Sequence, residues 1–91
     1  MAKKRERLEV IKDILEAIKE GRNNIKPTRL LYASNLSPQM FKDYINELLT
    51  KGFIKLENLE EGKKTFSLTR KGMEFLQEYR VIQNFIENFG L

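Results

Sequence analysis

The stretch of sequence that decides the fold is residues 27–54, PTRLLYASNLSPQMFKDYINELLTKGFI. Pro27 suits the first turn of a short helix, because its missing N–H would have no intrahelical partner there. Ser37 followed by Pro38 signals the start of a second helix, an N-cap residue and then a proline at the first helical position. Gly52 ends that helix. The order of these signals predicts two helices joined by a tight turn.

Apolar spacing predicts which sides of these helices are buried. The first helix, about 27–34, is expected to bury Leu30, Leu31 and Ala33. The second, 38–51, gathers its apolar residues on one face, namely Phe41, Tyr44, Ile45, Leu48 and Leu49. Its other side is expected to face solvent and carries Gln39, Met40, Lys42, Asp43 and Asn46.

A longer helix is expected upstream, over residues 5–20. Apolar residues recur there at spacings of three and four, at Leu8, Ile11, Ile14, Leu15 and Ile18. This spacing gives one buried stripe. Gly21 provides the stop, and Ile25 is a candidate for a one-residue bridge to a small sheet.

Beyond Gly52 the spacing changes to a period of two, which is typical of strands buried on one side. The apolar positions are Ile54, Leu56, Phe66 and Leu68. Thr65 and Ser67 alternate with them and are expected on the exposed side. Residues 58–63 connect the two strands into a β-hairpin. The predicted fold is therefore mainly α with a small β-hairpin wing, a winged helix-turn-helix whose second helix would fit the major groove of duplex DNA.

Thr69 is expected to cap a final helix of about 20 residues, which would be about 30 Å long. A seam of apolar residues steps along it by four, three, four and three, and Phe85 falls in the same arc. The seam consists of Phe75, Tyr79, Ile82, Phe85, Ile86 and Phe89. Such a helix is longer than one side of so small a domain. Residues 1–72 are therefore expected to form the DNA-binding part, and residues 73–91 a dimerisation helix. The alternative is that the helix folds back over its own domain.

Composition narrows the function classes. The 91 residues carry a net charge of +4, with a sequence pI near 9.4, and contain no His and no Cys. No His or Cys is therefore present to act as base, nucleophile or zinc ligand, so no enzymatic activity, cofactor or metal is expected. No apolar run approaches the ~18 residues of a membrane span. A cytoplasmic, nucleoid-associated location is expected.

The residues expected to contact DNA lie on three elements. Cations and free N–H groups at a helix start suit phosphate, and amide and Lys side chains on the second helix can reach base edges. Met40 could touch a thymine methyl or pack beside Phe41. The full set is Lys26, Thr28, Arg29, Ser37, Gln39, Met40, Lys42, Asn46, Lys63 and Lys64. Glu60 and Glu61 would oppose phosphate, so the wing tip is expected to bend away while Lys63 and Lys64 make contact.

The first residues are also basic. Lys3, Lys4, Arg5 and Arg7 have two open interpretations. They are either an arm that adds non-specific affinity by displacing counterions, or a solvated terminus.

The chain resembles the small archaeal winged-helix DNA-binding proteins of the chromatin type, of about ten kilodaltons, along nearly its whole length. The matching segments are ILEAI (14–18), TRLLY (28–32), NLS (35–37), LLTKGFI (48–54), LTRKG (68–72), Phe75-Leu76 and Tyr79. The resemblance implies a homodimer held by an antiparallel two-helix coil, with double-stranded DNA as the partner. The charges of Lys42, Asp43, Glu47 and Lys51 cancel on the second helix, which departs from a typical sequence-specific regulator.

The function expected from the sequence is therefore a homodimeric, architectural or broadly regulatory DNA-binding protein that recognises mainly phosphates and groove shape. No small-molecule effector is evident. Two alternatives remain, a sequence-specific transcription regulator and a winged-helix subunit that binds only protein.

Overall fold

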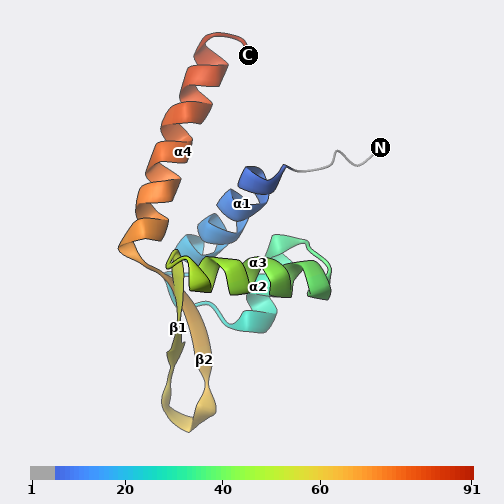
Figure 1. The fold of residues 1–91 in the computed structure, drawn as a ribbon. Helices are drawn as coiled ribbons and strands as arrows, with labels where there is room; N and C mark the ends of the chain where they lie inside the picture. Colours follow the sequence, from blue (N-terminus) through green and yellow to red (C-terminus); the bar gives the residue numbers. More distant parts are fainter. Residues whose placement is uncertain (1–5) are drawn as a thin grey trace.

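The computed structural model describes residues 6–91, and this part of the chain is mainly α-helical with one antiparallel hairpin (Figure 1). Its elements are α1 (Arg7–Glu20), α2 (Pro27–Ser34), α3 (Pro38–Thr50), β1 (Ile54–Asn58), the short 3-10 helix η1 (Glu60–Gly62), β2 (Lys64–Leu68) and α4 (Arg70–Asn88). The predicted fold class is confirmed. Helix α1 begins two residues later than expected, and α3 ends one residue earlier than expected.

Helices α1, α2 and α3 enclose the core together with the base of the hairpin. The apolar stripe of α1 is buried at Ile11, Ile14, Leu15 and Ile18, but Leu8 was wrongly expected in it, because Leu8 is exposed and Val10 is buried instead. In α2 the expectation was partly wrong: Leu30 is buried, but Leu31 is only half-buried and Ala33 is exposed. Ser34 is buried instead, because it lies one helical turn from Leu30 on the same face. Its Oγ donates to the carbonyl of Leu31 at 2.8 Å, which satisfies the buried hydroxyl.

The hairpin pairs β1 with β2 from Ile54 opposite Leu68 to Asn58 opposite Lys64. Ile25 adds the expected bridge, because its N–H donates to the Phe66 carbonyl at 3.3 Å and its carbonyl accepts the Phe66 N–H at 2.8 Å. Strand β2 is thus flanked on both sides.

This position explains why burial on one side only was a wrong expectation for β2. Thr65 and Ser67 are buried as well as Phe66 and Leu68, whereas Leu56 of β1, expected on the buried side, is exposed. Their short side chains lie beside the longer Glu57 and Lys55 of β1, which form an ion pair at 3.2 Å across that face. Long neighbours can cover short side chains even on the face away from the core.

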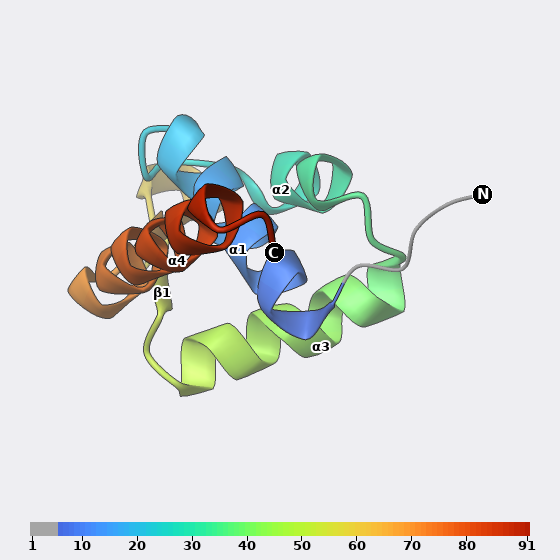
Figure 2. The ribbon, with the colours of Figure 1, turned by 90° about the horizontal axis from the view of Figure 1, so that it is seen from above.

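Helix α4 leaves the domain body and projects away from it on the side opposite the hairpin (Figure 1). Thr69 is its N-cap as expected, and the Thr69 Oγ1 accepts the N–H of Gly72 at 3.2 Å. The view from above shows α4 crossing over α1, with α3 on another side of α1 (Figure 2). The described residues extend 50 × 32 × 21 Å. None of their helices is long and apolar enough to cross a membrane.

Candidate nucleic-acid interface

Helix α3 is a fixed platform whose inner side is anchored in the core. Ile45 and Leu48 are buried, and Phe41 packs partly against the same cluster. The Ser37 Oγ accepts the N–H of Met40 at 3.3 Å, so the sequence signal for the start of this helix is confirmed. An anchored inner face leaves the opposite face of α3 in a defined orientation toward solvent.

The outward residues expected on α3 are all exposed: Gln39, Met40, Lys42, Asp43 and Asn46. They differ in what they can offer a partner. The Gln39 amide donates to a carboxylate oxygen of Asp43 at 3.1 Å, so one of its donors is already engaged. Within residues 6–91, the side chains of Lys42 and Asn46 have no such partner, which leaves them as the free polar groups of this face.

Glu47 lies on the flank of α3 that meets α1. Its carboxylate pairs with Arg7 and with Lys51, the latter at 2.7 Å. The hydrogen bonds from Arg7 and then from Lys51 lower the pKa of Glu47 to about 2. Of the four charged residues of α3 considered above, Glu47 and Lys51 therefore pair with each other, and Glu47 also pairs with Arg7 of α1. The other two, Lys42 and Asp43, lie on the outward face.

Arg7 does not belong to a separate basic arm, because it opens α1 and pairs with Glu47. The other three residues considered for that arm, Lys3, Lys4 and Arg5, lie outside the described residues. The spacing of Glu47 and Lys51 could have indicated their pair, but nothing local relates Arg7 to a residue forty positions away.

The start of α2 presents backbone donors and cations together. Lys26 occupies the N-cap position without a side-chain capping bond, and Thr28 and Arg29 are exposed. The bridge between Ile25 and Phe66 places Lys26 next to β2. This arrangement brings the α2 cations to the base of the wing, where free N–H groups and positive charge both favour an anion.

The wing carries charges of both signs at its far end. Lys63 and Lys64 are exposed, as are Glu60 and Glu61. The Leu59 N–H donates to the Lys63 carbonyl at 2.6 Å, which closes the loop, and Glu61 has a left-handed backbone with φ of 63°. The acidic pair thus occupies the tip, Lys63 follows the 3-10 helix, and Lys64 begins β2.

The seam expected on α4 divides into two parts. Phe75 meets Phe53 edge to face with ring centres 5.7 Å apart, and Tyr79 stacks on Phe75 at 6.0 Å, so both are partly covered by their own domain. The outer members are exposed: Ile82 by 57%, Phe85 by 56%, Ile86 by 40% and Phe89 by 68%. Val81 and Leu91 are also exposed and lie outside the predicted seam.

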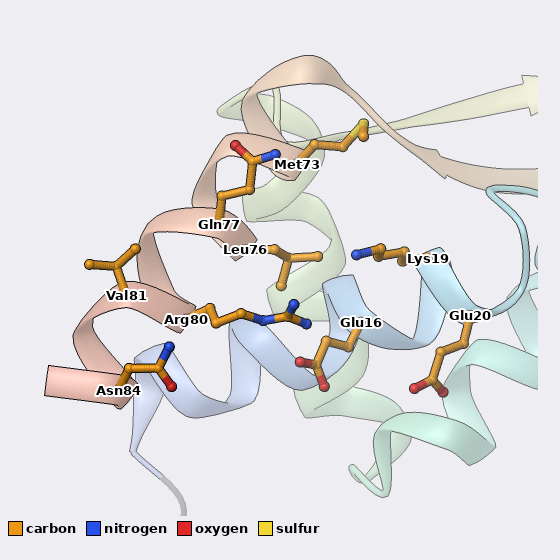
Figure 3. A pocket seen from close by; sticks show the side chains of 9 residues that line it. All are labelled: Glu16, Lys19, Glu20, Met73, Leu76, Gln77, Arg80, Val81 and Asn84. Atoms are coloured by element: carbon orange, nitrogen blue, oxygen red, sulfur yellow. The ribbon is translucent and has the colours of Figure 1, made fainter. Parts of the chain in front are cut away.

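A groove of about 560 Å³ lies between α1 and α4 (Figure 3). Its α4 side includes Met73, Leu76 and Arg80, and its α1 side Glu16 and Lys19. At about 100° per residue these α4 positions lie on a different side of the helix from the Ile82–Phe89 seam. The groove is therefore separate from the exposed apolar seam, and its mixture of charges selects no single ligand chemistry.

Metal binding has no structural basis in residues 6–91, where no three His, Cys, Asp or Glu side chains gather closely enough to hold an ion.

The arrangement of helices, turn and hairpin defines a class of protein. The sequence matches the winged helix-turn-helix family model over residues 4–87, and the chain belongs to that family. It is 46% identical over 69 residues to the uncharacterized protein MJ0287 of Methanocaldococcus jannaschii, a match that covers 76% of this chain and 64% of that relative. The chain thus spans less than two thirds of that relative's length.

Two solved structures share the fold at low sequence identity. Sso10a-2, a DNA-binding protein from Sulfolobus solfataricus, superposes with a TM-score of 0.74 at 21% identity and covers 93% of this chain and 85% of its own. MepR of S. aureus, in a complex with DNA, gives a TM-score of 0.71 at 14% identity over 87% of this chain and 58% of its own. Both similarities establish the fold of the chain.

Proposed function

We propose that this protein binds double-stranded DNA as a homodimer, mainly through phosphate contacts and groove shape, in an architectural or broadly regulatory role. The observation that carries the proposal is the solvent-facing side of α3, flanked by the basic start of α2 and by the wing. In winged helix-turn-helix folds this helix can enter the major groove while flanking cations hold the phosphates. The description of Sso10a-2 as DNA-binding and the MepR–DNA complex support the same reading.

Phosphate recognition is favoured over base readout by the side chains available. The exposed cations proposed to contact phosphate on the three elements are Lys26, Arg29, Lys42, Lys63 and Lys64. Base-reading groups are fewer, because on the outward face of α3 Gln39 is engaged with Asp43, and Lys42 and Asn46 are the side chains there with no hydrogen-bond partner within residues 6–91. Phosphate contacts give affinity and orientation but carry no base sequence directly.

The homodimer is proposed to form along the outer half of α4. Ile82, Phe85, Ile86 and Phe89 project into solvent at the spacing of a helical seam. An antiparallel pairing centred on Ile82 would place Tyr79 opposite the partner's Phe85, and Phe75 opposite the partner's Phe89. Each partly covered aromatic ring near the domain would then meet an exposed side chain from the far end of the other helix.

The expected gain from this pairing is of the same order as its cost. Complete burial of a Phe or Ile side chain contributes about 1.5–3 kcal/mol. Since the outer seam residues are roughly half exposed, eight of them in a pair would contribute on the order of 6–12 kcal/mol. Association costs about 4–15 kcal/mol in lost freedom. The two aromatic residues, Phe85 and Phe89, would therefore decide whether the dimer is stable.

The test of DNA binding is the salt dependence of affinity for a random-sequence duplex. About eight phosphate contacts per dimer would give a slope of log affinity against log salt near −7. Removing Arg29 with the substitution Arg29→Ala takes away one contact per protomer and should make the slope shallower by about 2 in the dimer. The matched control is Lys19→Ala, an exposed lysine of α1 beside the groove, which should leave the slope unchanged.

The two alternative functions give different results in the same experiment. A sequence-specific regulator, favoured by the free Lys42 and Asn46, would leave a footprint that survives competitor DNA and moderate salt. A winged-helix subunit that binds only protein would show no salt-sensitive retention of DNA. A slope near zero would contradict the proposal.

A further inference from the structure

The first turn of α4 is fastened to the turn that ends α3. The Thr69 N–H donates to the Phe53 carbonyl at 3.1 Å, and the Thr69 Oγ1 donates to the Gly52 carbonyl at 2.6 Å. The Lys71 ammonium donates to the Lys51 carbonyl at 2.8 Å. Lys51 is the C-cap residue of α3, so this last bond joins the end of one helix directly to the start of the other. We call these contacts the α3–α4 latch.

Gly72 completes the latch by allowing close approach. A Cβ atom at this position would lie 2.2 Å from the carbonyl oxygen of Phe53, so the backbones could not meet this closely with any larger residue. The Lys71 ammonium also lies 4.6 Å from the centre of the Phe53 ring, a favourable cation–π position. The segment LTRKG (68–72) thus packs on the segment KGF (51–53) through backbone hydrogen bonds, the Lys71 ammonium and the Phe53 ring.

The latch has a specific polarity. The last carbonyls of a helix lack intrahelical partners and carry partial negative charge, so a lysine ammonium is favoured there. The neighbouring cation Arg70 is instead 95% exposed and pairs along its own helix with Glu74, at 3.4 Å. Two adjacent basic residues therefore have different positions, and only Lys71 reaches α3.

We infer that Lys71 is a positioning residue for DNA binding, which sets the direction of α4 relative to α3 without touching DNA. The inference rests on the proposed function. If two protomers pair through α4, the angle at the latch fixes the separation and orientation of the two α3 helices. A duplex long enough to engage both domains then gains the advantage of two linked contacts, provided that the linkage holds the correct geometry.

The first test measures the latch within one protomer and needs neither DNA nor dimerisation. The natural chain has no cysteine, so spin labels can be placed at Asp43→Cys on α3 and Asn84→Cys on α4, both exposed positions. Labelled protein is diluted into unlabelled protein so that only distances within a protomer are recorded. Lys71→Met should broaden the distribution, whereas Arg70→Met, which removes the same charge one residue earlier, should leave it narrow.

The second test compares a short duplex that accommodates one domain with a long duplex that engages two. Lys71→Met should reduce the affinity advantage of the long duplex by about tenfold while the short-duplex affinity follows that of Arg70→Met. Lys71→Arg keeps a cationic donor and should restore most of the advantage. Sedimentation should report the same association state for all three variants.

The outcomes separate the inference from the proposal beneath it. Equal distance distributions for Lys71→Met and Arg70→Met would overturn the latch, whatever the DNA results. A broadened distribution with an unchanged long-duplex advantage would overturn the positioning role. If the unsubstituted protein binds neither duplex, the proposed function is wrong, and so is the positioning role. The distance measurement then still decides whether the latch holds α4.

Discussion

The two halves of α4 are built from similar residues but lie in opposite environments. In the first half, Phe75 packs on Phe53 and Tyr79 stacks on Phe75, and the latch fixes the backbone. In the second half, Phe85 and Phe89 pack on each other at 4.8 Å and otherwise face solvent. The aromatic residues of the first half stabilise the protomer, whereas those of the second half have no comparable cover within it.

This difference shows that a continuous apolar seam need not have one role. The seam runs along one side of the helix, yet the body of the domain covers only its beginning. Contiguous exposed apolar surface in a small protein commonly marks an interaction site. Substitutions of the same type at the two ends of α4 test whether the two halves have different roles.

The largest effect is expected from Gly72→Ala in the first half. The added methyl group would overlap the Phe53 carbonyl, so α4 or the α3–β1 turn must shift. We expect a loss of about 2–4 kcal/mol in the free energy of unfolding and a fall in Tm of roughly 10–20 °C, measured by thermal and urea denaturation.

Gly90→Ala is the matched control at the other end of α4. Gly90 has a φ of 69°, but nothing lies within 4 Å of the position of its added methyl group. Only local backbone strain is therefore expected, at most about 1 kcal/mol. Similar losses of stability at the two glycines would show that close approach at Phe53 is not what fixes α4.

A somewhat smaller effect, on association rather than folding, is expected from Phe85→Lys in the second half. Burying a charge in the proposed seam should raise the dimer dissociation constant by about 30- to 100-fold, or about 2–3 kcal/mol, in sedimentation. The protomer should retain its stability under conditions where it is monomeric, because Phe85 packs only on Phe89 among the ring contacts of residues 6–91.

Gln83→Lys introduces the same charge at an exposed position outside the seam and serves as the control. It should leave the dissociation constant nearly unchanged. If Phe85→Lys instead unfolds the monomer, the second half of α4 folds back over its own domain in solution, and the proposed dimer seam is wrong.

The smallest effect concerns pH and belongs to the domain body. The pKa of Glu47 is lowered from 4.5 to about 2 in the folded protein. The contribution of its ion pairs is therefore fully present above pH 4.5 and is lost as pH falls toward 2. In urea titrations between pH 6 and pH 2, Glu47→Gln should weaken the acid-dependent loss of stability.

Glu74→Gln is the comparison, since it removes a carboxylate from the exposed pair with Arg70 on α4. Its pH profile should stay close to that of the unsubstituted protein, because exposed pairs contribute little. A Glu47→Gln profile indistinguishable from that of Glu74→Gln would show that the pairs with Arg7 and Lys51 do not persist in solution.

Local signals in the sequence predicted the elements well. The cap residues Ser37 and Thr69, the isolated bridge at Ile25 and the exposed side of α3 were all confirmed. Each depends on a few neighbouring residues whose backbone preferences agree. The DNA contacts and the dimer seam stay predictions, because both involve a second molecule.

Features that depend on residues far apart in the sequence could not be predicted from such local signals. The exposure of Ala33 follows from how a two-turn helix packs on α1, and the burial of Thr65 follows from the longer Glu57 opposite it on β1. Gly72 belongs to a motif that the sequence shows, but the need for glycine there comes from the close approach of the Phe53 carbonyl, nineteen positions earlier. Arg7 and Glu47 are likewise related only by folding.

The projection of α4 also governs how the isolated protomer would behave hydrodynamically. A compact chain of this length would have a radius of gyration of about 12 Å, whereas the Cα atoms of the described residues give 14.0 Å. With a long axis of 50 Å and a short one of 21 Å, such a particle tumbles anisotropically. Amide relaxation in α4 would then reflect slow end-over-end rotation, and the antiparallel pairing proposed for α4, which sets the two domain bodies at opposite ends, would make the particle longer still.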